Sequence, residues 1–267
     1  MKRLRFLDKL GMTAGAVIVM ADFLYMPTDP EAARRYLQQL LISPTTLSSS
    51  QIADTWSPEV RAAAMFSATT ARDDALEELR QEILATMNVL TPIDGVVSGN
   101  DLASARLRFQ NWLADNGWER PEGVEPGSIA DLSSARRIDL IINTKVQQAY
   151  AVGDYRQQQT QEARALYPYL RYVADPRPTR RPDHWRLNGL ILPKDHLFWR
   201  GHTGPWDYNC FCTVEELSQD EAEAEGIGQA AVEGDRAIVT FSGGTFEVLA
   251  PASGYSFDPA LGLTEEA

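Results

Sequence analysis

The first two thirds of the chain carry apolar residues at helical spacing. A helix should begin at Asp29-Pro30, because an N-cap aspartate is followed by proline at the first helical position. The clearest amphipathic pattern starts near Thr70, the expected N-cap, and places apolar residues at steps of three and four: Leu76, Leu79, Ile83, Met87 and Leu90. Two further helices are predicted over about residues 101–115 and 133–166, the first ended by Asn116-Gly117.

The pattern changes after Tyr167-Pro168. Tyr169 to Val173 alternates like a strand, and an irregular segment follows up to Cys212. A short acidic helix is predicted over 214–225, and 236–241 with 245–249 should form a β-hairpin around Ser-Gly-Gly. The expected fold class is α+β, with a mainly helical N-terminal region before a compact, loop-rich core with a small C-terminal β-hairpin.

Linker-like composition suggests where this organisation divides. Pro and Gly are dense between Pro121 and Gly127. We expect a helical region over 1–120, a compact domain over 128–250, and an extended C-terminal tail over 251–267.

Composition and charge narrow the function. The 267 residues are 44% hydrophobic and 23% charged, which are the values of a globular protein. A net charge of −12 argues against a general nucleic-acid coat. The charge is uneven, with twelve acidic residues against one basic over 213–267, and seven basic against three acidic over 171–200. A local basic patch is therefore compatible with the acidic whole.

The N-terminus superficially resembles a secretion signal, because Lys2, Arg3 and Arg5 precede an apolar run from Leu10 to Ala21. That run is shorter than the roughly 20 residues that a bilayer requires. We expect residues 1–21 to form a helix that docks on a neighbouring protein, with no membrane partner. A secreted or envelope protein is the alternative.

The segment from Asp175 to Cys212 holds all three histidines, both cysteines and three of the six tryptophans. A segment of this length must be held together, either by aromatic packing or by a metal. A structural zinc site would use the two thiols and two imidazoles: His184, His196 (or His202), Cys210 and Cys212. Buried thiols and histidines in ordinary hydrogen bonds are the alternative, since one residue between zinc-binding cysteines is less common than two to four.

The order of residues in this segment resembles the phage Mu F-like head morphogenesis family. The matching positions are Asp175, Arg177, His184, Leu187, Gly189, Asp195, Phe198, Trp199, Pro205, Asn209, Cys210 and Cys212. The helix before the motif, over 135–159, is also similar. The chain departs from the family pattern at Asp207 and Tyr208, which replace glycine and tryptophan, and at Phe211, which replaces arginine.

The resemblance implies a minor head protein of a tailed phage or prophage, present in few copies near the portal, rather than an enzyme. Its partners would be portal, scaffold or capsid proteins. The helical region over 1–120 would be an arm that contacts the portal or scaffold, and 128–250 would be the head morphogenesis domain. It would reside in the host cytoplasm during assembly and then in the virion head. Packaged DNA is a further candidate partner, through the basic residues of the motif: Arg177, Arg180, Arg181, Arg186 and Arg200.

A metal-dependent nuclease or toxin-like enzyme is the rival hypothesis. His184 or His196 would act as a general base beside Asp183 or Asp195. The sequence carries no glycine-rich nucleotide loop, no Gly-x-Ser-x-Gly and no His-Glu-x-x-His, so the motif alone supports this hypothesis.

Overall fold

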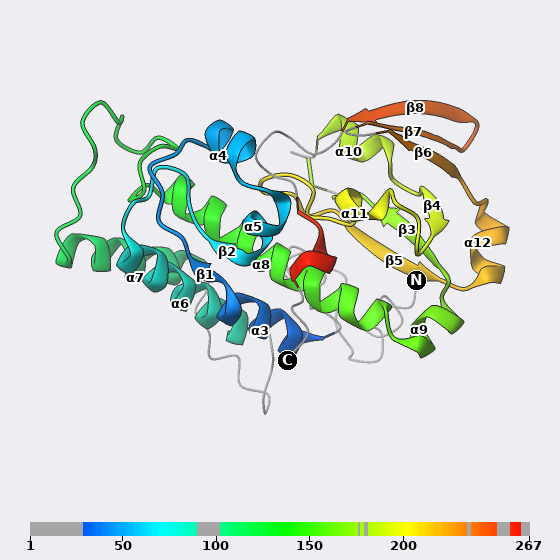
Figure 1. Cartoon of the computed structure of the whole chain (residues 1–267), viewed down its shortest axis with the longest axis horizontal. Coiled ribbons are helices and arrows are strands. Elements are labelled where there is room, and N and C mark those ends of the chain that lie inside the picture. The colour runs from blue at the N-terminus through cyan, green and yellow to red at the C-terminus, as the bar shows by residue number, and fades with distance from the viewer. Residues whose placement is uncertain are drawn as a thin grey trace.

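The computed structural model describes residues 29–89, 102–175, 177–178, 181–233, 236–249 and 257–262. Helices fill one half of the molecule and small sheets fill the other, and the long helix α8 (Ala135–Gln158) runs along both halves (Figure 1). The predicted α+β class is confirmed. The predicted helix over residues 1–21, Leu90 of the predicted amphipathic pattern and Arg180 lie outside the described residues.

The helical half follows the predicted pattern closely. Asp29 caps α3 (Pro30–Gln39) by accepting from the Ala32 amide at 2.8 Å, as its position before proline predicts. The remaining helices of this half are α4 (Ser49–Thr55), α5 (Pro58–Ala63), α6 (Asp73–Val89) and α7 (Leu102–Asp115). The two short helices α4 and α5 were not predicted, because neither is long enough to show a helical period.

Two details of the helical half differ from the prediction. Thr70 does not cap α6 but forms a β-bridge with Thr45, and the helix begins three residues later at Asp73. The predicted single helix over 133–166 is two helices, because the Thr160 hydroxyl accepts from the Ala163 amide and starts a second one, α9 (Gln161–Leu166).

The helical half encloses the first core, which packs apolar faces of α3, α6, α7 and α8 around Leu37, Leu79, Phe109 and Ile138. A two-residue parallel pair, β1 (Leu41–Ile42) with β2 (Ala64–Met65), borders it. Phe257 returns from the C-terminal segment into this core, before the 3-10 turn Pro259–Gly262. Because α8 packs here, the division between the cores follows α8 rather than the linker at 121–127.

The other half is built on two three-stranded antiparallel sheets. The first has the order β4 (Ile191–Pro193), β3 (Tyr169–Val173), β5 (Thr213–Leu217). The second is β6 (Gln229–Glu233), β7 (Arg236–Phe241) and β8 (Gly244–Leu249), so the predicted hairpin is confirmed and β6 joins its edge. Leu170, Tyr172, Val239 and Val248 belong to the second core, which lies between these sheets and the motif segment.

The predicted acidic helix over 214–225 is wrong in its first part. Thr213 to Leu217 pairs with β3, and the Ser218 capping box starts α12 (Gln219–Glu225) only afterwards. The motif segment itself contains two short helices, α10 (Pro182–Arg186) and α11 (Trp199–His202). Within the described residues, none of the helices is both long and apolar enough to cross a bilayer.

Candidate metal centre

Three side chains of the motif meet in the second core. Cys210 Sγ lies 3.5 Å and Cys212 Sγ 3.7 Å from His184 Nδ1, and all three residues are buried. The three potential ligand atoms lie within 4.8 Å of one another. We call these residues the His–Cys–Cys cluster.

Backbone donors surround the two sulfurs. The Asp175 amide donates to Cys212 Sγ at 3.3 Å, and the Cys212 amide donates to Cys210 Sγ at 3.4 Å. The contact with Cys210, helped by hydrogen bonds from His184 and Tyr172, lowers the pKa of the Cys212 thiol. The same contact and burial raise the pKa of Cys210. Cys212 is therefore the sulfur that more readily carries negative charge.

Stacked rings hold the cluster in place. The His184 ring stacks on Trp206 at 4.0 Å between centroids, and Trp206 meets Tyr172 edge-on, donating its indole N–H to the tyrosine hydroxyl. His202 lies 4.8 Å from Trp206 and stacks on Phe198 at 4.2 Å. The predicted aromatic packing and the predicted meeting of thiols and imidazole thus occur in one place.

A close backbone contact fixes the turn before the cysteines. Gly204 has φ +83°, and a Cβ at this position would lie 2.1 Å from the Cys212 carbonyl oxygen. A side chain there would collide with backbone, which cannot move away as a flexible side chain could. Glycine before Pro205 is therefore required for the chain to fold back over Cys212.

A small cavity of about 210 Å³ adjoins the cluster. Besides the three cluster residues, Asp175, Arg177, Arg181 and Asn209 line it. Arg177 pairs with Asp175 at 2.6 Å and stacks on the Phe211 ring at 3.8 Å. Because Arg177 holds the Asp175 carboxylate, this aspartate does not join the His–Cys–Cys cluster.

Comparison with known proteins finds a family that is similar to the part of the chain carrying this motif. Residues 93–215 match the family described as Phage Mu protein F like protein. This segment is similar to that family. A 97-residue stretch is 36% identical to the "Putative capsid assembly protein F" of Escherichia phage Mu, and covers 36% of this chain and 22% of that protein. Another of 156 residues is 29% identical to the "Mu-like prophage FluMu F protein" of Haemophilus influenzae, covering 58% and 37%.

The resemblance expected from the sequence is thereby confirmed. The chain spans about a fifth to two fifths of the length of these curated relatives. No solved structure matches it significantly.

The predicted motif residues have two structural roles: some are buried in the second core, and others form tight turns. Leu187, Phe198 and Trp199 are buried, and the Trp199 indole donates to the Pro193 carbonyl at 2.9 Å. Gly189 and Asn209 adopt positive φ, at 89° and 54°, in tight turns. Asp195 is exposed. Leu187, Phe198 and Trp199 therefore fill the second core, and Gly189 and Asn209 shape turns beside it.

The predicted ligand His196 is not brought to the cluster. Its Nδ1 accepts from the Phe198 amide at 3.1 Å, which ties it to its own turn. His202, the other possible fourth ligand, is buried but hydrogen-bonds through Nδ1 to the Phe198 carbonyl at 2.9 Å. Sequence spacing could not separate these histidines, because the choice depends on how α11 turns.

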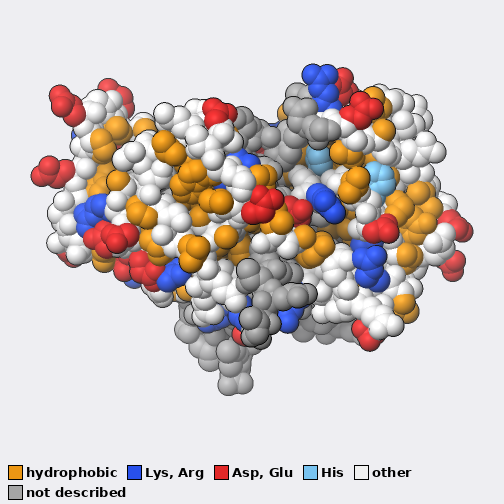
Figure 2. Space-filling model, in the orientation of Figure 1, with side chains coloured by type: hydrophobic (Ala, Val, Ile, Leu, Met, Phe, Trp, Pro, Cys, Tyr) orange, Lys and Arg blue, Asp and Glu red, His pale blue; other side chains and the backbone are white. Residues whose placement is uncertain are grey.

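Three of the predicted DNA-contacting arginines pair with carboxylates. Besides Arg177, Arg181 lies 3.0 Å from Asp207, and Arg186 lies 4.0 Å from Asp183. Arg200 is exposed on α11. On the face that Figure 2 shows, Lys and Arg side chains are scattered among acidic ones instead of forming a continuous patch.

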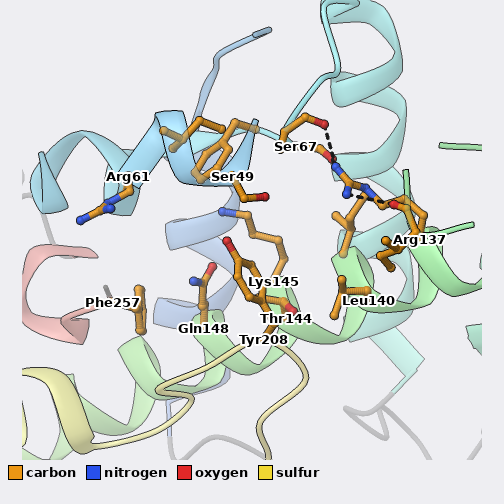
Figure 3. A pocket seen from close by; sticks show the side chains of 15 residues that line it. Ser49, Arg61, Ser67, Arg137, Leu140, Thr144, Lys145, Gln148, Tyr208 and Phe257 are labelled. Atoms are coloured by element: carbon orange, nitrogen blue, oxygen red, sulfur yellow. Dashed lines mark hydrogen bonds between the residues drawn. The ribbon is translucent and has the colours of Figure 1, made fainter. Parts of the chain in front are cut away.

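Sequence reasoning missed a second polar feature, a cavity of about 290 Å³ beside Lys145 of α8 (Figure 3). The Lys145 amine is buried, donates to the Ala64 carbonyl at 3.1 Å and lies 5.2 Å from the Phe66 ring. Burial lowers the pKa of Lys145 to about 8. Its place on the apolar side of the predicted helix was the available signal.

Cationic and apolar side chains line the cavity beside Lys145. Arg61 of α5, Arg137 and Tyr208 line it together with apolar residues of α4, α8 and the segments beside them, and none of the described lining residues is Asp or Glu. Arg137 donates to Ser67 Oγ at 2.6 Å and to the Ala68 carbonyl at 2.7 Å. Arg61 Nε and Gln148 Oε1 are buried with no hydrogen-bond partner among the described residues. An anionic group on an apolar ligand would match this lining.

Proposed function

We propose that the chain acts in assembly of a tailed-phage head, as a minor head protein that binds another head protein near the portal. The observation that carries this proposal is the match of residues 93–215 to the Mu F-like family, which includes a protein named for capsid assembly. The virion head is the corresponding location. The matched segment spans α8 and the motif, so it supplies part of both cores.

Burial of the motif residues supports a structural role over catalysis. His184 stacks against Trp206 and faces two thiols, so it is not positioned as an exposed general base. His196 is tied to its own turn, and Asp183 is exposed beside Arg186. The nuclease hypothesis therefore gains no support from the arrangement of its candidate residues.

The cavity beside Lys145 is the contact surface that best fits a protein partner. A head-protein segment with an apolar side chain next to a carboxylate would fill the apolar lining and pair with Lys145. A buried lysine without a carboxylate is costly, and an acidic partner would offset that cost. Contact with DNA has less support, because Arg177, Arg181 and Arg186 already pair with acidic side chains.

The general proposal is tested by deleting the gene from the phage or prophage that encodes it. Electron microscopy should then show few DNA-filled heads, and quantitative mass spectrometry should find the chain in purified wild-type heads. Normal yields of infectious heads without the gene, or heads that lack the protein, would overturn the proposal.

The contact surface is tested separately with Lys145→Met in the same phage. Loss of a charge-assisted contact should weaken partner binding about tenfold or more, as a contact of ~1.5–3 kcal/mol implies. Heads should then incorporate less of the variant, although the variant remains folded. Normal incorporation would refute docking at this cavity and leave the deletion result to decide the general proposal.

DNA contact requires its own measurement. If it occurs, binding of the purified chain to duplex DNA should weaken steeply as salt rises, and Arg200→Ala should reduce it. A flat salt response would remove DNA from the list of partners.

A further inference from the structure

The His–Cys–Cys cluster brings together three side chains that are favoured zinc ligands. Thiolate sulfur and imidazole nitrogen bind Zn²⁺ at about 2.3 Å and 2.0–2.1 Å, so tetrahedral geometry places a sulfur and a nitrogen ligand about 3.6 Å apart. The two observed distances, 3.5 Å for Cys210 Sγ and 3.7 Å for Cys212 Sγ from His184 Nδ1, agree with this spacing. Both sulfurs face the same imidazole nitrogen.

The groups around the cluster are those that support a bound metal. The Asp175 and Cys212 amides each donate to a sulfur, and hydrogen bonds of this kind orient metal ligands and stabilise negative charge on them. Trp206 fixes the plane of the His184 ring by stacking. Two thiolates and one neutral imidazole would balance the charge of a divalent cation.

A fourth ligand position is also provided. The cavity of about 210 Å³ opens onto the cluster and is lined with polar side chains, including Asp175 and Asn209. A water molecule requires only about 30 Å³ and two to four polar partners, so the cavity can hold a metal-bound water. The Asp175 carboxylate already pairs with Arg177. Water is therefore favoured over this aspartate as the fourth ligand.

We propose that His184 Nδ1, Cys210 Sγ and Cys212 Sγ bind a single Zn²⁺ ion, with water from the adjoining cavity completing the coordination. The ion connects α10, which carries His184, to the turn that carries both cysteines. It joins residues 26 and 28 positions apart in the sequence. Because the site forms only when the chain folds, the binding free energy of the ion stabilises the folded motif segment. This inference is independent of the head-assembly proposal.

The test uses the full chain, purified without chelator from medium containing zinc. Elemental analysis should give one zinc per chain. Replacement by Co²⁺ should produce the intense near-ultraviolet sulfur-to-cobalt absorption and visible bands of a tetrahedral site. No zinc after reconstitution, together with an octahedral cobalt spectrum, would overturn the proposal.

Two single variants separate the proposed ligand set from its neighbours. Cys212→Ser should lose the zinc and the sulfur-to-cobalt absorption, whereas His196→Ala should retain both in full. Zinc lost from His196→Ala, or fully retained in Cys212→Ser, would show that the ligand set is wrong.

If Cys212→Ser fails to fold, alkylation of the two cysteines in the wild-type chain still tests the proposed ligands. Both cysteines should resist an alkylating reagent in the zinc-loaded protein and react after the metal is removed with a chelator. A disulfide would also resist alkylation, but it would lower the intact mass by two hydrogen atoms and would be opened by a reductant. Protection that responds to reductant and not to chelator would overturn the proposal.

Discussion

The described part of the chain buries two lysines, Lys194 and Lys145, and they differ in what surrounds the charge. Lys194, after β4, donates to Glu216 at 2.6 Å and to the carbonyls of Gln158 and Ala163 at 3.1 and 3.2 Å. Lys145, in the first core, donates to the Ala64 carbonyl, and no Asp or Glu is among the described residues that line its cavity. Both are 5% exposed, so burial does not separate them.

The two lysines therefore differ in whether a carboxylate of the described chain neutralises the buried charge. Lys194 ties α8 and α9 to β5 through a set of contacts complete within the chain, as expected for a residue that connects elements. Lys145 lies beside a cavity whose described lining residues include no Asp or Glu, which fits the proposed docking of an acidic partner segment there. The same change at both sites should therefore have opposite effects on stability.

The largest effect is expected for Trp206→Ala, which removes the ring that supports the second core. Truncation of a buried tryptophan costs about 3–5 kcal/mol through lost burial and the cavity left behind. Here it would also leave His184 and Tyr172 without their ring contacts. Urea denaturation should show this loss of stability. Trp206→Phe keeps an aromatic ring and should lose no more than about half as much stability as Trp206→Ala. A change below ~1 kcal/mol would mean that the second core does not depend on this stack.

Lys194→Met should destabilise the chain by roughly 3 kcal/mol, because Glu216 would keep its charge without its buried partner. The matched control is the double variant Lys194→Met with Glu216→Leu, in which both charges are removed. If ion pairing is the cause, the double variant should recover most of the stability measured by urea denaturation. Equal losses in both variants would instead assign the effect to altered packing.

Lys145→Met should stabilise the chain by roughly 2 kcal/mol at pH 7. The pKa shift from 10.5 to about 8 corresponds to a charge-burial cost of about 3 kcal/mol, against which the variant loses one hydrogen bond of about 1 kcal/mol. Loss of stability in Lys145→Met at pH 7 would contradict the view that this lysine is unpaired.

The pH dependence at Lys145 has a definite sign. The unfolded lysine binds a proton up to pH 10.5, but the folded one releases it near pH 8, so the cost is fully present below pH 8. As pH rises from about 8 to 10.5, the free energy of unfolding of the wild type should therefore increase relative to that of Lys145→Met. Among the other groups that line the cavity, burial lowers the pKa of the Arg137 guanidinium and raises the pKa of the Tyr208 hydroxyl. A stability difference that is constant from pH 7 to 10.5 would contradict the assignment.

The smallest effect is expected where the charges are exposed. Arg236 and Glu247 pair at 3.3 Å on the β7–β8 hairpin, with side chains 63% and 56% exposed. Arg236→Ala should change the free energy of unfolding by less than about 0.5 kcal/mol, since water and salt screen such pairs. A larger loss in thermal denaturation would mean that ion pairs contribute more here than their exposure suggests.

Much of this organisation follows from local pattern. The spacing of Leu76, Leu79 and Ile83 predicts α6, and the alternation of Tyr169 to Val173 predicts β3, because each pattern extends over enough residues to define its period. The cluster partners Cys210, Cys212 and His184 also follow from the motif, although His196 does not join them.

The parts that were not predicted depend on tertiary contacts. Thr213 to Leu217 is acidic and reads as helix, yet pairing with β3 makes it a strand. Lys145 reads as one polar residue on an apolar helix side, and only the packing of Phe66 and Ala64 against it reveals a buried cation. Its cavity joins α4, α5, α8 and the turn at Tyr208, which are distant in the sequence.

Hydrogen exchange followed by mass spectrometry tests the central claim most directly, namely that a bound metal fastens the core formed by the motif segment. Zinc-loaded protein should be compared with the same protein after chelation. The account predicts faster exchange in β3, α10 and the turn over residues 203–213, with α3 and α6 of the first core unchanged. Unchanged protection around the His–Cys–Cys cluster after verified zinc removal, or an equal loss in both cores, would contradict it.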